Sequence, residues 1–173
     1  ILLSGEYPDI VFEKSIDKAK HYIFEGYNAL IKADNVETAL SQLDQFKILC
    51  AHNSGEYGTL QLNHVCEKIL RSGNNFDIQD NPFKKVIMVN KNDYKKGLFN
   101  GDTGVVFERN KEATAFFKMQ DDKINRYRNS DLPGFDAAFA ITIHKSQGSE
   151  FNTVLIIIPD KLSPVMTRQL LYT

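Results

Sequence analysis

Several features that would restrict the function of this chain are absent from its sequence. It contains only two cysteines, Cys50 and Cys66, and its net charge is −1. Both cysteines lie in apolar-periodic segments without His or Cys at metal-ligand spacing, so we predict reduced core residues rather than a disulfide framework or a zinc site. Because no global positive field exists, any nucleic-acid binding must come from a local face.

Long apolar runs and targeting segments are also missing. No run approaches the roughly 20 residues of a membrane span, and Ile1 begins no basic-then-apolar signal sequence. We therefore expect a soluble, cytoplasmic protein without a membrane partner. The first residue is Ile, and a helical pattern that starts at Ser163 has no stop signal before Thr173, so we expect a segment of a longer protein.

The motif that holds nucleotide phosphates in many ATPases is absent too. None of the ten glycines is followed by lysine, which excludes a G-x-x-x-x-G-K-[ST] loop. Phosphoryl transfer depends on that lysine and on a magnesium site, so we expect no ATP hydrolysis by this chain alone. The acidic residues Asp77, Asp80, Asp121 and Asp122 lack a His or a third carboxylate at ligand spacing, and an exposed turn at 121–122 is the better interpretation than a metal or nuclease site.

The first half of the chain has the pattern of an α/β protein. Apolar residues recur at helical spacing over 13–33, 36–46 and 59–71. Residues 47–52 form a short apolar stretch that predicts a strand, and 53–58 is rich in turn residues. The resulting strand–loop–helix order is typical of α/β folds.

The second half predicts strands. Short strands are expected over 86–89, 103–108, 114–119 and 123–128, separated by turn residues, and this spacing favours a small antiparallel β-barrel at 84–132 inserted into the α/β unit. Residues 139–143 and 154–158 then resume apolar strands of the kind that are buried on both faces.

The connection between those two apolar strands is the best candidate for a functional site. It reads Thr-Ile-His-Lys-Ser-Gln-Gly-Ser-Glu-Phe over 142–151. If the strand continues, Thr142 and His144 emerge on the same side. Ser146 is expected to cap a short helical turn, and Gly148 to let a phosphate approach the backbone. Glu150 would suit a ribose hydroxyl or a neighbouring cation. Taken singly, such residues are more often structural: a lone histidine is usually a surface or core residue.

As a unit, the same ten residues resemble motif V of superfamily 1 DNA helicases, and they are most similar to the RecD branch, the alpha subunit of exodeoxyribonuclease V. Three further stretches are similar to that family, namely 49–63 (motif IV), 92–104 (the start of the inserted barrel) and 164–173 (the approach to motif VI). The resemblance implies a RecA-like, P-loop-type second motor domain made of 1–83 and 133–173, with 84–132 as its inserted barrel.

The family also implies roles for individual residues. Thr142 and His144 would contact single-stranded DNA, Gln147 and Gly148 the nucleotide phosphates, and Glu150 the ribose. The intact enzyme would use ATP and Mg²⁺, with the Mg²⁺ site outside this chain, and would translocate 5′ to 3′ in recombinational DNA repair. Its partners would be a missing N-terminal motor domain and, for a true alpha subunit, RecB- and RecC-type subunits.

Two departures from the family leave an alternative open. Asn53 stands where RecD-like proteins commonly carry an arginine, and the arginine expected in motif VI lies beyond Thr173. An amide cannot offer a guanidinium fork to a γ-phosphate. The alternative is a non-catalytic RecA-like module for DNA binding or protein docking.

A basic segment near the predicted barrel is a second candidate for DNA binding. Its lysines and one aspartate give a local charge of +4, and Tyr94 and Phe99 are interleaved with them; the charged residues are Lys84, Lys85, Lys91, Asp93, Lys95 and Lys96. Basic residues with aromatics suit single-stranded DNA. Lys95 and Lys96 are the predicted contacts, and a solvated, lysine-rich edge strand is the competing interpretation.

Overall fold

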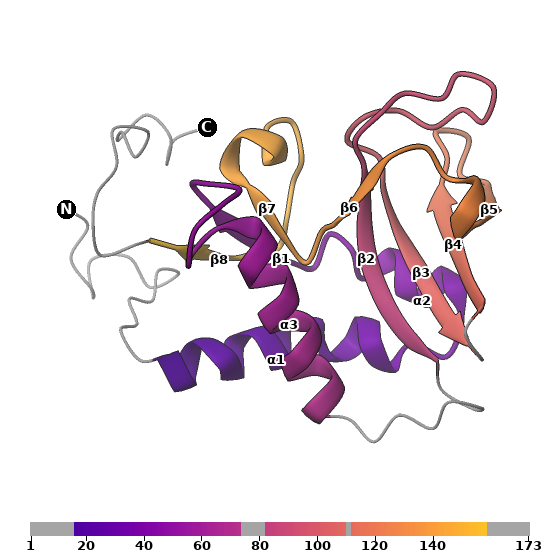
Figure 1. The fold of residues 1–173 in the computed structure, drawn as a ribbon. Coiled ribbons are helices and arrows are strands. Elements are labelled where there is room, and N and C mark those ends of the chain that lie inside the picture. Colours follow the sequence, from indigo (N-terminus) through magenta and orange to yellow (C-terminus); the bar gives the residue numbers. More distant parts are fainter. Residues whose placement is uncertain (1–15, 74–81, 110–111, 159–173) are drawn as a thin grey trace.

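The chain folds into two β-sheets with helices packed against them (Figure 1). The computed structural model describes residues 16–73, 82–109 and 112–158. The predicted helix from Ser163 and the residues Asp77 and Asp80 therefore lie outside the described residues. None of the described helices has the length and apolar character that a membrane span requires. The elements are α1 (Ile16–Lys32), α2 (Val36–Ser41), β1 (Phe46–Cys50), α3 (Thr59–Gly73), β2 (Phe83–Val89), β3 (Thr103–Arg109), β4 (Glu112–Lys118), β5 (Ile124–Arg128), η1 (Asn129–Asp131), β6 (Phe135–Ala137), β7 (Ala140–Thr142), η2 (Ile143–Ser146) and β8 (Thr153–Ile157).

The smaller sheet is parallel and has β1 at its centre, in the order β7-β1-β8. All five residues of β1 are buried. Strands in such a position carry continuous apolar runs, and the predicted strand 47–52 contains such a run at 48–51. Helices α1 and α3 pack against each other and against this sheet. The parallel sheet with its helices confirms the predicted α/β class.

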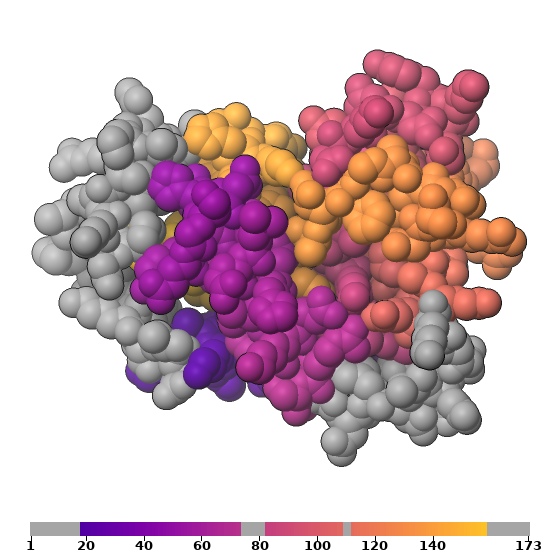
Figure 2. Space-filling model, viewed as in Figure 1, coloured from indigo at the N-terminus to yellow at the C-terminus, as the bar shows by residue number. Residues whose placement is uncertain are grey.

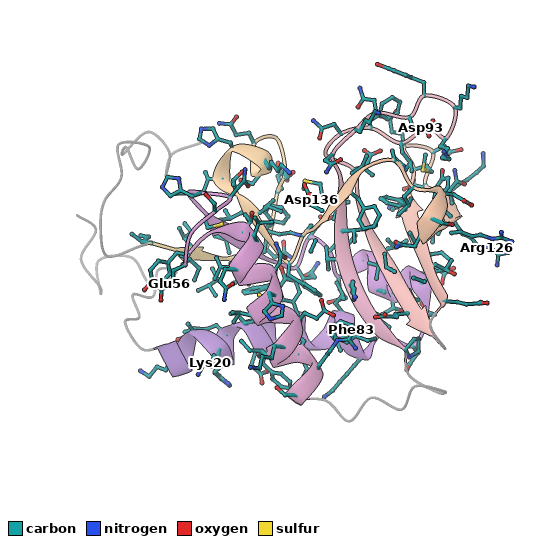
Figure 3. The ribbon with its side chains drawn as sticks, in the orientation of Figure 1. Lys20, Glu56, Phe83, Asp93, Arg126 and Asp136 are labelled. Atoms are coloured by element: carbon teal, nitrogen blue, oxygen red, sulfur yellow. The ribbon has the colours of Figure 1, made fainter. Side chains whose placement is uncertain are left out.

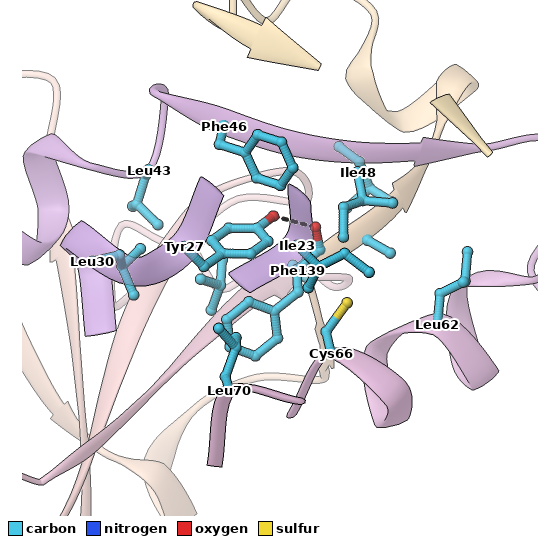
Figure 4. Packing of buried hydrophobic residues seen from close by; sticks show 14 of the residues in the cluster. Ile23, Tyr27, Leu30, Leu43, Phe46, Ile48, Leu62, Cys66, Leu70 and Phe139 are labelled. Carbon is cyan, nitrogen blue, oxygen red and sulfur yellow. Dashed lines mark hydrogen bonds between the residues drawn. The ribbon is translucent and has the colours of Figure 1, made fainter. Parts of the chain in front are cut away.

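Tyr27 organises the core between α1 and the parallel sheet (Figure 4). Its ring meets the rings of Phe46 and Phe139 edge-on, with centroids 5.0 Å apart in each pair. Its hydroxyl donates a hydrogen bond to the backbone oxygen of Phe139. Cys66 lies in the same core, and both it and Cys50 are free and buried. The prediction of two reduced core cysteines is therefore confirmed.

The second helix is shorter than its apolar pattern predicted. It was expected over 36–46, but α2 ends at Ser41. Asn35 caps its start by accepting a hydrogen bond from the backbone N–H of Thr38 at 2.8 Å. Phe46 instead begins β1, where it pairs with Thr153 of β8. Phe46, the last apolar residue of the predicted helix, therefore belongs to the sheet and not to the helix.

The larger sheet is antiparallel, with strand order β5-β4-β3-β2-β6. The expected closed barrel is wrong for the described residues, because β5 and β6 do not pair and form the two edges of an open sheet. Strand β6 pairs with β2 over only Phe135–Ala137 before the chain leaves for β7. Helix α2 packs on β3 and β4. A second small core on this sheet contains Leu98, which comes from the long β2–β3 connection.

Strand β8 also departs from expectation. Residues 154–158 were expected to be buried on both faces, but Val154, Ile156 and Ile158 are 43%, 38% and 48% exposed. These side chains alternate along the strand and share one face. Within the described ranges that face of the strand is therefore only partly covered.

Candidate functional site

Two connections leave the parallel sheet at the same edge. In the parallel pairing of β1 with β7, Cys50 lies opposite Thr142, and both residues end their strands. The loop 51–58 follows β1, and the connection to β8 follows β7. In an open α/β sheet the carboxyl ends of adjacent strands border the crevice in which ligands bind. The motif that the sequence singled out is therefore at the edge where a ligand site is expected.

The first half of that connection is a 3₁₀ turn rather than a continued strand. Thr142 is only 7% exposed, and its hydroxyl oxygen accepts a hydrogen bond from the backbone N–H of Lys145 at 3.3 Å. The prediction that Thr142 and His144 share a strand face is wrong, because Ile143 already belongs to the turn. His144 is exposed on that turn.

Ser146 was predicted to cap a short helical turn, but it is the last residue of η2. Its hydroxyl donates to the backbone oxygen of Ile143 at 2.8 Å, and its own carbonyl accepts from the N–H of Ser149 at 2.9 Å. Thr142 holds the cap position instead. A β-branched hydroxyl residue at the end of a strand is well placed to accept from the third residue of the turn.

The second half of the connection is open to solvent. Gln147, Gly148 and Glu150 are all exposed. Gly148 has a φ of +82°, and an added Cβ would meet nothing within 4 Å. The backbone conformation, rather than crowding, is what requires glycine here. No ion pair joins Glu150 to a side chain in the described part of the chain, so its carboxylate faces solvent.

The loop after β1 is held against the start of α3. Thr59 donates its backbone N–H to the oxygen of His52 at 3.0 Å, and its hydroxyl donates to the side-chain oxygen of Asn53 at 3.2 Å. Gly58 fits tightly, since an added Cβ would lie 2.5 Å from the backbone oxygen of Ser54. Asn53, the residue in place of the family's arginine, is thus part of the loop's own hydrogen bonding.

Asn63 is a residue whose contacts the sequence did not reveal. In the sequence it stands out only as the last residue of the motif IV stretch 49–63. In the structure its buried amide reaches β7, donating to the backbone oxygen of Ala140 at 2.8 Å and accepting from the Ala140 N–H at 2.9 Å. The available signal was its position on the apolar side of α3 near Leu62 and Cys66, because a buried amide needs partners.

A groove of about 450 Å³ lies between α3 and the segment that joins the two sheets. Lys145 of η2 and Asp136 of β6 form an ion pair across 3.2 Å at this groove. Asp136 lies in the link between the sheets, as Figure 3 shows. In Figure 2 the η2 connection and the β2–β3 connection rise on the upper side with a hollow between them. The residues that line the groove include Leu60, Asn63, His64 and Met88.

The predicted cluster of five available lysines is not borne out by their positions. Lys84 is 1% exposed and donates to the backbone oxygen of Ile31 at 2.8 Å. Burial lowers its pKa. Lys85 pairs with Glu67 and Glu108 at 3.3 Å and 3.4 Å. A buried ammonium group needs hydrogen-bond partners, and the backbone oxygens of Ile31 and Pro82 supply them here.

Lys95 and Lys96 lie on the β2–β3 connection, on the larger sheet. Lys96 pairs with Asp93 at 2.6 Å, and this ammonium group holds the pKa of Asp93 below its ordinary value. Lys95 is exposed, and its backbone N–H donates to the same carboxylate at 3.1 Å. Tyr94 is 78% exposed and meets the ring of Phe99 edge-on at 5.8 Å. The connection therefore presents aromatic rings beside exposed lysines, and in the described part of the chain Lys96 is its only lysine with an ion pair.

The acidic pair Asp121–Asp122 lies in an exposed turn, as predicted. Asp121 pairs with Lys123 at 2.6 Å and Asp122 with Lys118 at 2.8 Å. Among the residues that the structure describes, no three His, Cys, Asp or Glu side chains gather as a metal site requires.

The sequence of this chain is similar to those of known helicase proteins. Residues 137–173 match the model of the UvrD-like helicase C-terminal domain. Over 98% of its length the chain is 30% identical to "RecBCD enzyme subunit RecD" of Mycolicibacterium smegmatis, and over 84% it is 33% identical to the Mycobacterium tuberculosis protein of that name. The chain spans 30% and 25% of these two curated relatives. It is also 27% identical over 73% of its length to "ATP-dependent RecD2 DNA helicase" of Deinococcus radiodurans, covering 18% of that protein.

Among solved structures, the chain is similar to the Pif1 helicase from Bacteroides in complex with ADP-AlF3 and ssDNA. The match has a TM-score of 0.47 and 16% sequence identity, and it covers 92% of this chain and 46% of that one.

Proposed function

This chain is a RecD-like segment of a superfamily 1 helicase, and from that premise we propose that it forms the second RecA-like motor domain of an ATP-dependent DNA helicase. The observation that carries the proposal is the position of the 142–150 connection. It leaves β7 beside the loop that leaves β1, at the carboxyl edge of a parallel sheet, and it exposes His144, Gln147, Gly148 and Glu150 there.

On the nucleotide side, we assign Gln147 and the backbone of Gly148 to the phosphates and Glu150 to the ribose. Gly148 adopts a left-handed conformation and has no side chain, which suits close approach of a ligand to the backbone at this point. The carboxylate of Glu150 is free of described partners and can accept hydrogen bonds from hydroxyl groups.

On the DNA side, we assign Thr142, His144, Lys95 and Lys96 to the single strand. The Thr142 oxygen accepts a hydrogen bond within η2, so its own O–H remains available as a donor. Lys95 and the exposed ring of Tyr94 combine charge with a stacking surface, as single-strand binding requires.

Within this proposal, the short connection couples the two ligands. Thr142 and Glu150 belong to the same short connection, so a shift that nucleotide binding imposes on Gly148 reaches His144 through Gln147 and the end of η2. Translocation would be 5′ to 3′, as the RecD resemblance implies.

The remaining catalytic parts are proposed to lie on a further RecA-like domain of a longer polypeptide. That domain would supply the phosphate-binding lysine and the groups that hold Mg²⁺, since this chain has no Gly-Lys pair. RecB- and RecC-type subunits are candidate partners in recombinational DNA repair. The names of the relatives favour this motor over the non-catalytic alternative.

The test uses the full-length protein and measures ATP hydrolysis with and without single-stranded DNA. We expect Glu150→Ala to raise KM for ATP about tenfold, the scale of one hydrogen bond to a charged group. His144→Ala should weaken DNA binding with little change in that KM. The matched control is Gln61→Ala, an exposed amide on α3. A full-length wild type without DNA-stimulated ATP hydrolysis would refute the proposed function.

A further inference from the structure

Strand β7 has a buried edge that no strand within 16–73, 82–109 or 112–158 covers. The backbone N–H of Ile48 in β1 donates to the carbonyl oxygen of Phe139, so the backbone groups of Ala140, the next residue, point away from β1. Ala140 is 1% exposed. A buried N–H or C=O without a partner costs roughly 1–3 kcal/mol, so this edge requires a substitute for a neighbouring strand.

The side chain of Asn63 is that substitute. Its amide forms a cyclic pair of hydrogen bonds with Ala140, as the backbone of an adjacent strand would. The second N–H of the amide donates to the backbone oxygen of Thr59 at 2.8 Å. Only one orientation of the amide satisfies all three bonds, because its oxygen must face the Ala140 N–H.

These bonds complete a continuous path between the two connections at the carboxyl edge. The loop after β1 is attached to Thr59 through the oxygen of His52, and Thr59 is attached to Asn63. Asn63 holds Ala140, two residues before Thr142, and Thr142 holds the backbone N–H of Lys145. Residues 77 positions apart in the sequence are thereby joined through one amide.

We propose that Asn63 is a positioning residue that makes the loop 51–58 and the 142–150 connection move as one body. The inference rests on the proposed function and extends it: the 142–150 connection is assigned contacts to both ligands, so the nucleotide and the single strand of DNA influence each other through its geometry, which this amide maintains by holding Ala140. Because its amide is buried and forms three hydrogen bonds to the backbone, we assign Asn63 no contact with either ligand. Its removal therefore uncouples two binding events without removing a contact to either one.

This role differs from mere stabilisation in what it predicts. A residue that only stabilises the fold changes the amount of folded protein and leaves the ratio between two DNA affinities intact. A positioning residue changes the ratio itself, because a coupling free energy belongs to the pair of sites rather than to either site. The quantity to measure is therefore the factor by which a non-hydrolysable ATP analogue changes the dissociation constant for single-stranded DNA.

The experiment compares the full-length wild type with Asn63→Leu, which is close in shape but forms none of the three bonds, and with Gln61→Leu, which removes an exposed amide from the same helix. We expect Asn63→Leu to reduce the factor at least about 5-fold, the lower end of typical coupling. The DNA affinity without nucleotide and the KM for ATP without DNA should stay within about twofold of wild type. Gln61→Leu should match the wild type throughout.

Two results separate the possible failures. A wild type whose DNA affinity does not respond to the ATP analogue refutes the proposed function. A responsive wild type with the same factor in Asn63→Leu refutes the role of Asn63, as does a variant in which both single-ligand affinities fall together. If Asn63→Leu does not fold, Asn63→Asp takes its place, because a carboxylate still accepts from the Ala140 N–H but repels the two carbonyl oxygens.

Discussion

Lys47 provides a quantitative test of the packing around β1. The side chain is 1% exposed although it carries a charge, and its ammonium group donates to the backbone oxygen of Ala138 at 3.2 Å. The ring of Phe151 lies 5.5 Å from the same nitrogen. Burial lowers the pKa of Lys47 from 10.5 to about 8, and the charge of Asp44 opposes this shift only in part.

The sign of the effect follows from proton binding. Below pH 8 both the folded and the unfolded chain carry the proton, and the folded state bears the full cost of the buried charge. Between pH 8 and 10.5 the unfolded chain binds more protons, so this group makes stability rise with pH. A shift of this size corresponds to about 3 kcal/mol in total, of which about 1 kcal/mol is recovered between pH 7 and 9.

The perturbation is Lys47→Met, which keeps the length of the side chain and removes the titration. We expect the free energy of unfolding of the wild type to rise by about 1 kcal/mol relative to the variant between pH 7 and 9, as urea titrations at several pH values would measure. Taking the difference matters, because burial raises the pKa of Cys50 to about 11 and of Cys66 to about 12. Both thiols lower stability above pH 9 in wild type and variant alike.

The control is Lys68→Met, an exposed lysine on α3. It measures what the loss of an exposed ammonium group does to the free energy of unfolding at each pH. A Lys47→Met difference that changes with pH no more than the Lys68→Met difference would refute the reasoning, because it would mean that the Lys47 ammonium group is as well solvated in the folded state as in the unfolded chain.

Three further predictions follow from single contacts. Tyr27→Phe removes the hydrogen bond to the Phe139 oxygen and should lower the free energy of unfolding by about 1–3 kcal/mol in urea titrations; an unchanged midpoint would contradict it. Gly58→Ala brings a Cβ to 2.5 Å from a backbone oxygen and should lower the melting temperature, with a cost of about 1–3 kcal/mol, and full stability would show that the loop relaxes freely. In the full-length protein, Lys95→Ala should reduce the slope of log affinity for single-stranded DNA against log salt by about 0.7, whereas Lys123→Ala, whose ammonium already pairs with an aspartate, should leave it unchanged.

Much of the α/β order could be read from local patterns. Strand β1 and helix α3 lie within a few residues of their predicted bounds, because an apolar run between polar segments and a helical apolar period are properties of neighbouring residues. The four strands β2 to β5 were recognisable for the same reason. Whether these strands close into a barrel could not be predicted in this way. Closure requires β5 to pair with β6, and the path of the chain after Ala137 leaves them as the two edges of an open sheet.

The candidate site divides in the same way. The sequence by itself determined which residues stand between β7 and β8, and that one of them, Gly148, leaves the backbone without a side chain. Only the tertiary structure decided that Thr142 caps a 3₁₀ turn, that Lys84 is buried, and that Asn63 serves as the missing neighbour of β7. The physical reason is the range of the interactions: periodicity and turn preference act over a few residues, whereas buried polar groups must find partners wherever the folded chain brings them.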